Sequence, residues 1–255
     1  MTPLLRTMVE AALEAGREIE AIYGAGCAEE IKADGSPVTE ADRRAEAIIL
    51  SRLSAAFPDI PVLAEEEACA GRVPELGDRF FCVDPLDGTR GFVARNGEFT
   101  VNIAFAEGGV ASAGVIYAPD THMLYYGALG EGAFRRRNGS DAEPIRARAA
   151  PSDGLTAIAS RTTAHKTAAK LAHLPIAAFA PSSSSLKFCL LAEGAADVYP
   201  RYGPTMEWDT AAGQAILEAA GGRVMALEGD TEAGPLRYGK IDRNFENPHF
   251  IAWGA

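Results

Sequence analysis

The chain has 255 residues, of which 47% are apolar and 23% charged, a composition typical of a globular protein of one or two domains. Lys and Arg number 24 against 35 Asp and Glu, and the net charge of −11 argues against a protein that holds nucleic acid or an anionic membrane through its overall charge. Small anionic substrates remain compatible with this balance, because bound metal ions can reverse the sign of a site locally.

The cysteines and the apolar runs of the sequence indicate in which cellular compartment the protein is expected. The four cysteines, Cys27, Cys69, Cys82 and Cys189, are too scattered for a disulfide scaffold and form no Cys-x-x-Cys pair. Cys82 and Cys189 stand in apolar runs and are predicted to be core residues. Glutamates interrupt the first residues, where a signal peptide needs a continuous apolar stretch. No run approaches the roughly 18 apolar residues of a membrane span, so the sequence favours a reducing cytoplasm.

The first half of the chain predicts two helices and then a series of strands. A helix is expected over residues 3–23, ending at Gly24. A second helix is expected from Thr39, which forms with Asp42 the T-x-x-D pattern of a capping box. From Phe80 to Phe134, apolar segments separated by glycine-containing turns predict β-strands.

After about Pro144 the pattern changes to alternating strands and helices. The expected elements are a strand over residues 155–160, a helix over 163–174, a helix over 184–194, a strand over 196–200 and a helix over 209–222. This change predicts a boundary near residue 150, between an N-terminal α+β half (1–150) and a C-terminal α/β half (151–255).

The strongest chemical signal is FFCVDPLDGTRGF at residues 80–92. A buried strand is expected to deliver Asp84 at its C-terminal end, and the tight turn that Gly88 permits lets Asp87 face the same point. Two carboxylates about 4 Å apart repel by about 4 kcal/mol at an effective dielectric constant near 20, so such a loop is costly without a cation. The alternative is an ordinary capped turn, because Asp and Gly are common turn residues.

Two further acidic segments strengthen the interpretation of residues 80–92 as part of a metal site. Glu65, Glu66 and Glu67 follow a short predicted strand, and such a run taken alone is a solvated acidic loop. Asp209, in TMEWDTAAG, opens a predicted helix whose small residues allow close approach to other backbone; the alternative for it is an ordinary N-cap. Taken together, acids at a strand end, a further glutamate and an aspartate at a helix start are what a two-metal phosphatase needs.

Competing motifs are excluded by their spacing. The sequence contains no G-x-x-x-x-G-K-[ST], no G-x-G-x-x-G after a strand and no Gly-x-Ser-x-Gly elbow. Asp84 and Asp87 stand at i, i+3, whereas phosphatases of the haloacid dehalogenase type need two aspartates at i, i+2. The four histidines show no metal-ligand spacing and are expected at the surface.

DPLDGT followed downstream by WDTAAG resembles the paired signature of the inositol monophosphatase superfamily of Mg²⁺-dependent, lithium-sensitive phosphatases. Further segments are similar to its CysQ-type 3′(2′),5′-bisphosphate nucleotidases: SPVTEAD (36–42), PVLAEEE (61–67), DPLDGTRGFVARNGEFTVNIAF (84–105), GVIYAP (114–119) and SSLKFCLLAEGAADVYPRYGPT (184–205). The resemblance extends to Asn247-Pro248 and so covers nearly the whole chain.

The resemblance implies roles for individual residues. The implied ligands of two or more Mg²⁺ ions are the carboxylates of Glu65, Asp84, Asp87 and Asp209 and the carbonyl of Leu86. Thr89 and Asp42 are implied to polarise the attacking water, with Glu65 near it. Among the ligands, Asp84 is implied to bridge two ions.

For the substrate, the resemblance implies that the amides of Gly88 and Thr89 hold the scissile phosphate beside the metal ligands Glu65, Leu86, Asp87 and Asp209. Ser184, Lys187 and Arg201 are implied to contact the nucleotide and its second phosphate. The alternatives are a solvated helix residue for Lys187 and an ordinary surface charge for Arg201. The chain departs from its relatives at Gly91, where they carry a glutamate, which would alter the loop beside the metals without removing a ligand.

The implied fold is a layered αβαβα sandwich with the site between its two halves. The implied reaction is attack of water on the 3′-phosphorus of adenosine 3′,5′-bisphosphate (PAP), giving AMP and phosphate, with the sulfated relative PAPS as a further substrate and a role in sulfur assimilation. Two alternatives stay open: a phosphatase of inositol-1-phosphate or of sugar phosphates in general, and an inactive, metal-free scaffold. The resemblance implies inhibition by Li⁺ and leaves open inhibition by Ca²⁺, a homodimer and peripheral attachment to the cytoplasmic side of the inner membrane. No nucleic-acid partner and no integral membrane segment are expected.

Overall fold

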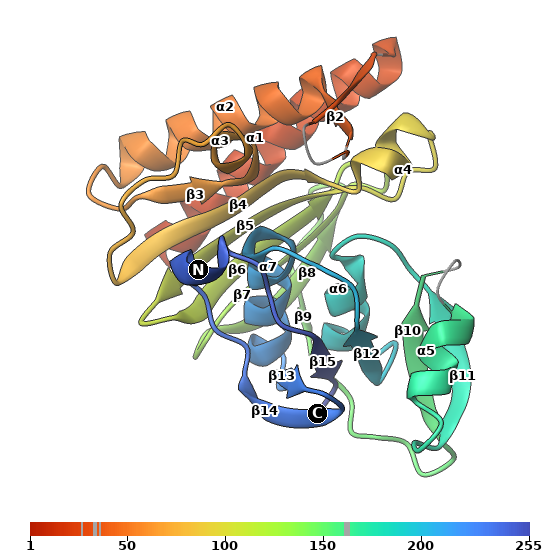
Figure 1. Cartoon of the computed structure of the whole chain (residues 1–255). Coiled ribbons are helices and arrows are strands. Elements are labelled where there is room, and N and C mark those ends of the chain that lie inside the picture. Colours follow the sequence, from red (N-terminus) through yellow and green to blue (C-terminus); the bar gives the residue numbers. More distant parts are fainter. Residues whose placement is uncertain (27, 33–34, 36, 161–163) are drawn as a thin grey trace.

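Two β-sheets separated by helices organise the chain, as the computed structural model shows (Figure 1). The structure describes residues 1–26, 28–32, 35, 37–160 and 164–255. Cys27, Ser36 of the SPVTEAD match and Thr163, where one predicted helix begins, lie outside these residues. The helices are α1 (Pro3–Ala25), α2 (Glu40–Ala56), α3 (Glu65–Cys69), α4 (Thr89–Val93), α5 (Ala164–Lys170), α6 (Leu186–Ala192), α7 (Glu207–Ala219) and the 3₁₀ turn η1 (Ile241–Arg243).

The first sheet has seven strands in chain order: β3 (Val62–Ala64), β4 (Arg79–Asp87), β5 (Thr100–Glu107), β6 (Val110–Ala118), β7 (Met123–Ala128), β8 (Gly132–Arg137) and β9 (Glu143–Ile145). β3 pairs with β4 in parallel, and every later pair is antiparallel. A separate hairpin joins β1 (Glu29–Ile31) to β2 (Pro37–Thr39).

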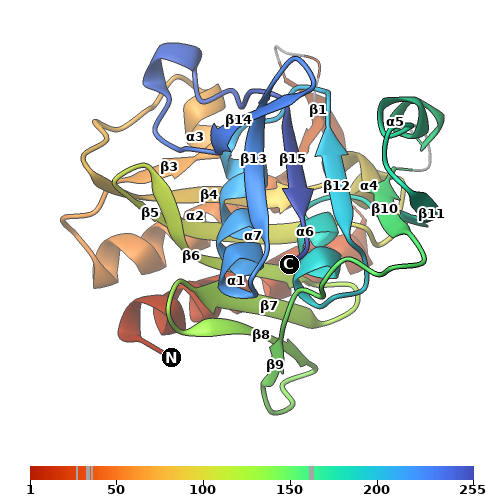
Figure 2. The same cartoon turned by 90° about the horizontal axis from the view of Figure 1, so that it is seen from below.

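The second sheet has six strands: β10 (Leu155–Ala159), β11 (Ile176–Pro181), β12 (Val198–Arg201), β13 (Arg223–Glu228), β14 (Thr231–Pro235) and β15 (Phe250–Trp253). Their order is β11-β10-β12-β15-β13-β14, and β10 lies parallel to both its neighbours. Figure 2 shows its strands crossing those of the first sheet at a steep angle, with α6 and α7 between the two.

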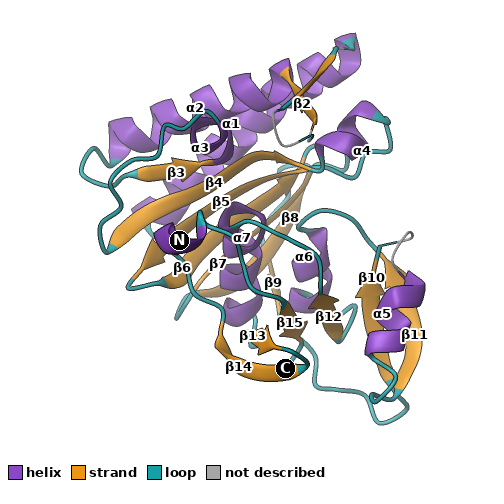
Figure 3. Ribbon diagram, in the orientation of Figure 1, coloured by secondary structure: helices purple, strands orange, loops and turns teal. Residues whose placement is uncertain are grey.

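The layers follow the predicted αβαβα order (Figure 3). α1 and α2 cover one face of the first sheet through a buried apolar cluster, and α6 and α7 cover the other face through a second cluster shared with the inner face of the second sheet. A third cluster, which includes Leu171 just after α5, covers the outer face of the second sheet. α7 approaches the first sheet closely: a Cβ at Gly114 of β6 would lie 2.3 Å from the carbonyl oxygen of Ala212.

The early predictions are confirmed with small changes. The first helix forms and ends at Ala25, two residues beyond the predicted last residue, with Gly26 in the left-handed region as its cap. Thr39 and Asp42 form the predicted capping box of α2. Cys82 and Cys189 are buried, and all four histidines are exposed.

Other predictions need correction. The helix predicted over 163–174 ends at Lys170, where the chain turns into β11, a strand that the sequence did not predict. α7 begins at Glu207 rather than at Asp209. The chain passes from the first sheet to the second between Ile145 and Leu155, but α7 of the C-terminal half packs on β4, β5 and β6, so a division into domains near residue 150 stays a prediction.

Candidate active site

Alternation along β4 directs the first acid of the DPLDGT segment toward α7. Phe81 and Val83 face α1 and α2, whereas Cys82 faces α6 and α7. Asp84, two residues after Cys82, therefore points to the same side, and it is 1% exposed. Asp84 lies inside β4 rather than at its end, because the strand continues to Asp87, but the pairing with β5 is irregular between these two acids. The amide of Leu86 donates to Asp84 Oδ1 at 3.0 Å and holds the carboxylate within this irregular segment.

Gly88 makes the turn after β4 possible. Its φ of +94° lies in the region that favours glycine, and a Cβ there would lie 2.6 Å from the carbonyl oxygen of Glu98. α4 starts at Thr89, directly after this turn. At Gly91, a Cβ would lie 2.7 Å from Asn96 Oδ1, so a larger residue here, such as the glutamate expected from the resemblance, would require Asn96 to move.

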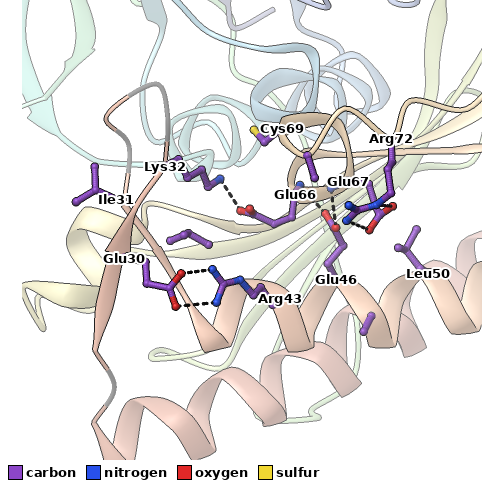
Figure 4. Close-up of a pocket in the computed structure, with 13 residues that line it drawn as sticks. Glu30, Ile31, Lys32, Arg43, Glu46, Leu50, Glu66, Glu67, Cys69 and Arg72 are labelled. Atoms are coloured by element: carbon purple, nitrogen blue, oxygen red, sulfur yellow. Dashed lines mark hydrogen bonds and ion pairs between the residues drawn. The ribbon is translucent and has the colours of Figure 1, made fainter.

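The acidic run after β3 is a short helix, α3, and the prediction of a loop is wrong. Glu46 of α2, 4% exposed, accepts hydrogen bonds from the amides of Glu66 at 2.8 Å and Glu67 at 3.0 Å (Figure 4). These bonds satisfy two donors of the first turn of α3 and so fix the direction of Glu65 at its start. Burial raises the pKa of Glu46 to about 7. The sequence did not single out Glu46, because its partners lie 20 and 21 residues away.

Lys32, which follows β1, contacts the same acids. Its Nζ lies 2.8 Å from Glu65 Oε1 and 2.6 Å from Glu66 Oε1, and the second of these contacts is drawn in Figure 4. Only 10% of the Lys32 side chain is exposed. No motif in the sequence marked Lys32 as a partner of Glu65.

Asp209 is held by the first turn of α7. It is not the N-cap but the third residue of the helix, and its Oδ2 accepts the amide of Met206 at 2.8 Å. Burial, and then the like charge of Asp87, raise the pKa of Asp209 to about 8. Burial and the charges of Glu65, Asp87 and Asp209 raise the pKa of Asp84 well above its usual value.

The donor set of these four acids fits a divalent cation. Glu65, Asp84, Asp87 and Asp209 come from α3, β4 and α7, and like charge among them contributes to the raised pKa values of Asp84 and Asp209. In this conformation Glu65 pairs with Lys32, and among the described residues no three His, Cys, Asp or Glu side chains are grouped as a metal site. Their role as metal ligands therefore stays a prediction.

Thr89 connects the turn to α2. Its Oγ1 lies 3.1 Å from Asp42 Oδ1 and 3.1 Å from the carbonyl oxygen of Leu86. The other oxygen of Asp42 accepts both the amide and the hydroxyl of Thr39, each at 2.7 Å. Burial raises the pKa of Asp42, which is 1% exposed. The capping box of α2 thus also holds the carboxylate that contacts Thr89.

The predicted substrate residues Lys187 and Arg201 line a cavity of about 820 Å³, together with Tyr199, Tyr202 and residues of α5. Lys187 is 8% exposed, so the alternative of a solvated helix residue is wrong. Its Nζ donates to the carbonyl oxygen of Ser184 at 2.8 Å, and burial lowers its pKa to about 8.

Arg201 and Ser184 carry unsatisfied polar atoms. Nε of Arg201 and Oγ of Ser184 are buried and have no hydrogen-bond partner among the described residues, while the end of the Arg201 guanidinium donates to the carbonyl oxygen of Pro204 at 3.0 Å. Ser184 has a φ of +46°, unusual for a residue with a side chain. An unsatisfied atom such as Nε of Arg201, which lines the cavity, is expected where a polar ligand completes the site.

Comparison with known proteins identifies the class. The model of the inositol monophosphatase family matches residues 1–250. The chain is 42% identical to the 3′(2′),5′-bisphosphate nucleotidase CysQ of Salmonella typhimurium over 89% of this chain and 92% of that protein. It is 39% identical to the CysQ of Escherichia coli O157:H7 over 97% and 98% of the two chains. The crystal structure of CysQ from Bacteroides thetaiotaomicron superposes with a TM-score of 0.78 at 39% identity, covering 98% of this chain and 96% of that one.

The chain belongs to the inositol monophosphatase family. Its similarity is to the CysQ-type bisphosphate nucleotidases, as the motifs predicted, and the predicted layered fold is confirmed. The prediction of a hydrolase that acts as a phosphatase is confirmed as well. Within the part of the chain that the structure describes, no helix combines the length and apolarity needed to cross a membrane.

Proposed function

We propose that this chain hydrolyses the 3′-phosphate of adenosine 3′,5′-bisphosphate, releasing AMP and inorganic phosphate, with Mg²⁺ as its cofactor. The bisphosphate nucleotidases that it resembles over most of its length suggest the substrate class. Because the two phosphates of this substrate are separated, its site needs an acidic part that binds cations near one phosphate and a basic part near the other.

The pair of basic residues at the cavity, buried Lys187 and half-buried Arg201, is the observation that favours a nucleotide bisphosphate over an inositol monophosphate. Neither Lys187 nor Arg201 forms an ion pair with a carboxylate among the described residues, although Lys187 and the Nε of Arg201 are buried. An unpaired buried charge is destabilising, so the pair is expected to have an anionic partner that is not part of the chain. A guanidinium suits a phosphate, because it can donate two parallel hydrogen bonds.

The acidic part fits Mg²⁺ for an electrostatic reason. Burial and like charge raise the pKa values of Asp84 and Asp209, and a bound cation would favour the ionised form of both carboxylates. The groups that would hold the ion are Glu65, Asp84, Asp87, Asp209 and the carbonyl of Leu86. When bound, Mg²⁺ supplies positive charge that offsets the charge on the phosphate oxygens during transfer.

The contact between Thr89 and Asp42 supports a role for this pair in taking a proton from the attacking water. The Thr89 hydroxyl can donate to Asp42 Oδ1 and accept a hydrogen bond from a water at the same time. As the water oxygen forms its bond to phosphorus, its proton moves to Thr89 and that of Thr89 to Asp42. The bond between phosphorus and the 3′-oxygen breaks, and this oxygen takes a proton from solvent.

A phosphate-release assay with and without Mg²⁺ tests the proposal. The panel is adenosine 3′,5′-bisphosphate, PAPS, inositol-1-phosphate and fructose 1,6-bisphosphate at equal concentrations. We expect the highest kcat/KM with the nucleotide bisphosphate and no release after chelation. A higher kcat/KM with inositol-1-phosphate would support the inositol phosphatase instead, and no release from any substrate would support the inactive scaffold.

The finer predictions from the resemblance belong to the same proposal. They are inhibition by Li⁺, hydrolysis of PAPS, a role in sulfur assimilation, a homodimer and a cytoplasmic location. Inhibition by Li⁺ is measured in the same assay at low substrate, and the oligomeric state by light scattering.

A further inference from the structure

Ser185 joins the two halves of the acidic site. It directly precedes α6 and is 2% exposed. Its Oγ lies 2.9 Å from Asp87 Oδ2, at the end of β4, and 2.9 Å from the backbone oxygen of Asp209, in α7. A third contact, also of 2.9 Å, comes from Nδ2 of Asn102 in β5. One buried hydroxyl therefore contacts a side chain of the first half, the backbone that carries Asp209 and the strand beside Asp84.

A hydroxyl has a single proton to donate, and this determines which of the three contacts Ser185 accepts and which it donates. Asn102 donates its amide proton to Ser185 and occupies one of the acceptor positions of the hydroxyl. The single proton of Ser185 is then available to Asp87 or to the carbonyl of Asp209. A carboxylate oxygen is a stronger acceptor than a backbone carbonyl oxygen, so the bond to Asp87 is favoured.

The position of Asn102 ties the same network to Asp84. Asn102 is directly opposite Asp84 in the pairing of β4 with β5, and both are 1% exposed. Both side chains point to the α6–α7 side of the sheet, because Ala104, two residues after Asn102, belongs to the apolar cluster on that side. Asn102 thus lies opposite Asp84 and Ser185 contacts Asp87, which are two of the acids proposed to hold Mg²⁺.

We propose that Ser185 is a positioning residue for the cation site: its hydroxyl orients the Asp87 carboxylate relative to the start of α7 and thereby sets the affinity of the site for a divalent ion. This inference rests on the proposed function, because it takes Asp87 and Asp209 as the ligands. Partners that orient metal ligands typically contribute about 10- to 100-fold to metal affinity. Ser185 does not need to touch the ion or the substrate for this effect.

Titration of Mg²⁺ alone into the substrate-free protein, followed by calorimetry, tests the inference. Ser185→Ala should weaken Mg²⁺ binding by about 10- to 100-fold. Ser185→Cys, whose thiol is a weaker donor of similar size, should give an intermediate loss and serves as a second variant if Ser185→Ala folds poorly. At saturating Mg²⁺, the KM of Ser185→Ala for adenosine 3′,5′-bisphosphate should stay close to that of the wild type.

A matched control and a second site separate positioning from a general loss of structure. Ser112→Ala removes a hydroxyl of β6 whose contact, at 3.4 Å, is to the backbone of Phe105, so Mg²⁺ affinity should not change. Asn102→Ala should weaken Mg²⁺ binding less than Ser185→Ala, and the double variant should bind like Ser185→Ala alone, because both act through one hydroxyl.

The outcomes distinguish this inference from the proposed function. If the wild type binds Mg²⁺ and releases phosphate while Ser185→Ala binds Mg²⁺ equally well, the inference is overturned and the proposed function stands. Additive losses from Asn102→Ala and Ser185→Ala would also overturn it, because the two residues would then act separately. If the wild type neither binds Mg²⁺ nor releases phosphate, the proposed function fails and the inference fails with it.

Discussion

Lys32 forms an ion pair of 2.8 Å with Glu65, one of the acids proposed to hold Mg²⁺. The two residues are 33 positions apart, and the side chain of Lys32 is 10% exposed. The Lys32 ammonium therefore neutralises part of the negative charge of the acidic site. A cation that uses Glu65 as a ligand has to compete with it.

Replacing Lys32 by Gln should accordingly lower the Mg²⁺ concentration needed for half-maximal activity, by about fivefold, or about 1 kcal/mol. Titration of phosphate release against Mg²⁺ measures this. Arg43→Gln is the matched control, because Arg43 pairs with the exposed Glu30 beside the same hairpin. A higher Mg²⁺ requirement in Lys32→Gln would mean that Lys32 supports cation or substrate binding instead.

Asp209→Asn should nearly abolish activity while stabilising the metal-free protein at high pH. Because the pKa of Asp209 is raised from its ordinary value of 3.8 to about 8, the folded state holds a proton that the unfolded state has lost between these pH values. Stability from this group is present below pH 4 and is lost as the pH rises through about 8.

The asparagine is neutral at every pH and keeps an oxygen for the amide of Met206. With a chelator present, thermal unfolding of Asp209→Asn should occur at a higher temperature than that of the wild type at pH 8, and the difference should shrink at pH 5. An equal difference at both pH values would contradict the raised pKa. Activity near that of the wild type at saturating Mg²⁺ would contradict the assignment of Asp209 as a ligand.

Arg201→Ala should raise KM for adenosine 3′,5′-bisphosphate by about tenfold or more, which is about 1.4 kcal/mol or above. Arg201 ends β12 beside the cavity, and its buried Nε has no hydrogen-bond partner in the part of the chain that the structure describes. Hydrolysis of inositol-1-phosphate, which lacks a second phosphate, should change much less. Equal losses on both substrates would show that Arg201 is structural or contacts the scissile phosphate.

Binding of the second phosphate should depend on the protonation of Lys187. Burial lowers its pKa to about 8, so the free protein carries the ammonium below this pH and loses it above. KM for adenosine 3′,5′-bisphosphate should therefore increase as the pH rises beyond about 8. In Lys187→Arg the cation persists, because a guanidinium stays protonated, and the increase should disappear. A KM independent of pH in the wild type would show that Lys187 does not bind substrate as a cation.

Much of the fold followed from local patterns. The stripe of α1, the capping box of Thr39 and Asp42, and the buried apolar strand β4 each depend on residues within a few positions of one another. Elements without such signals were missed or misjudged. β11, β13, β14 and β15 are short strands that form through pairing with other strands of the second sheet. α3 forms where the Glu46 carboxylate of α2 accepts hydrogen bonds from two backbone amides of its first turn.

The candidate site likewise has residues that the sequence predicts and contacts that only the tertiary structure shows. The sequence by itself determined which acids belong to the last residues of β4, the segment after β3 and the first turn of α7, because spacing and residue type are enough to recognise the motifs. Only the tertiary structure decided what surrounds them: Lys32 on Glu65, Glu46 behind α3, and Ser185 between Asp87 and Asp209. These partners come from distant parts of the chain. These contacts form because α2, α3 and α7 pack on the first sheet and α6 packs on α7, which brings distant polar groups together in a site where a buried charge must find a partner.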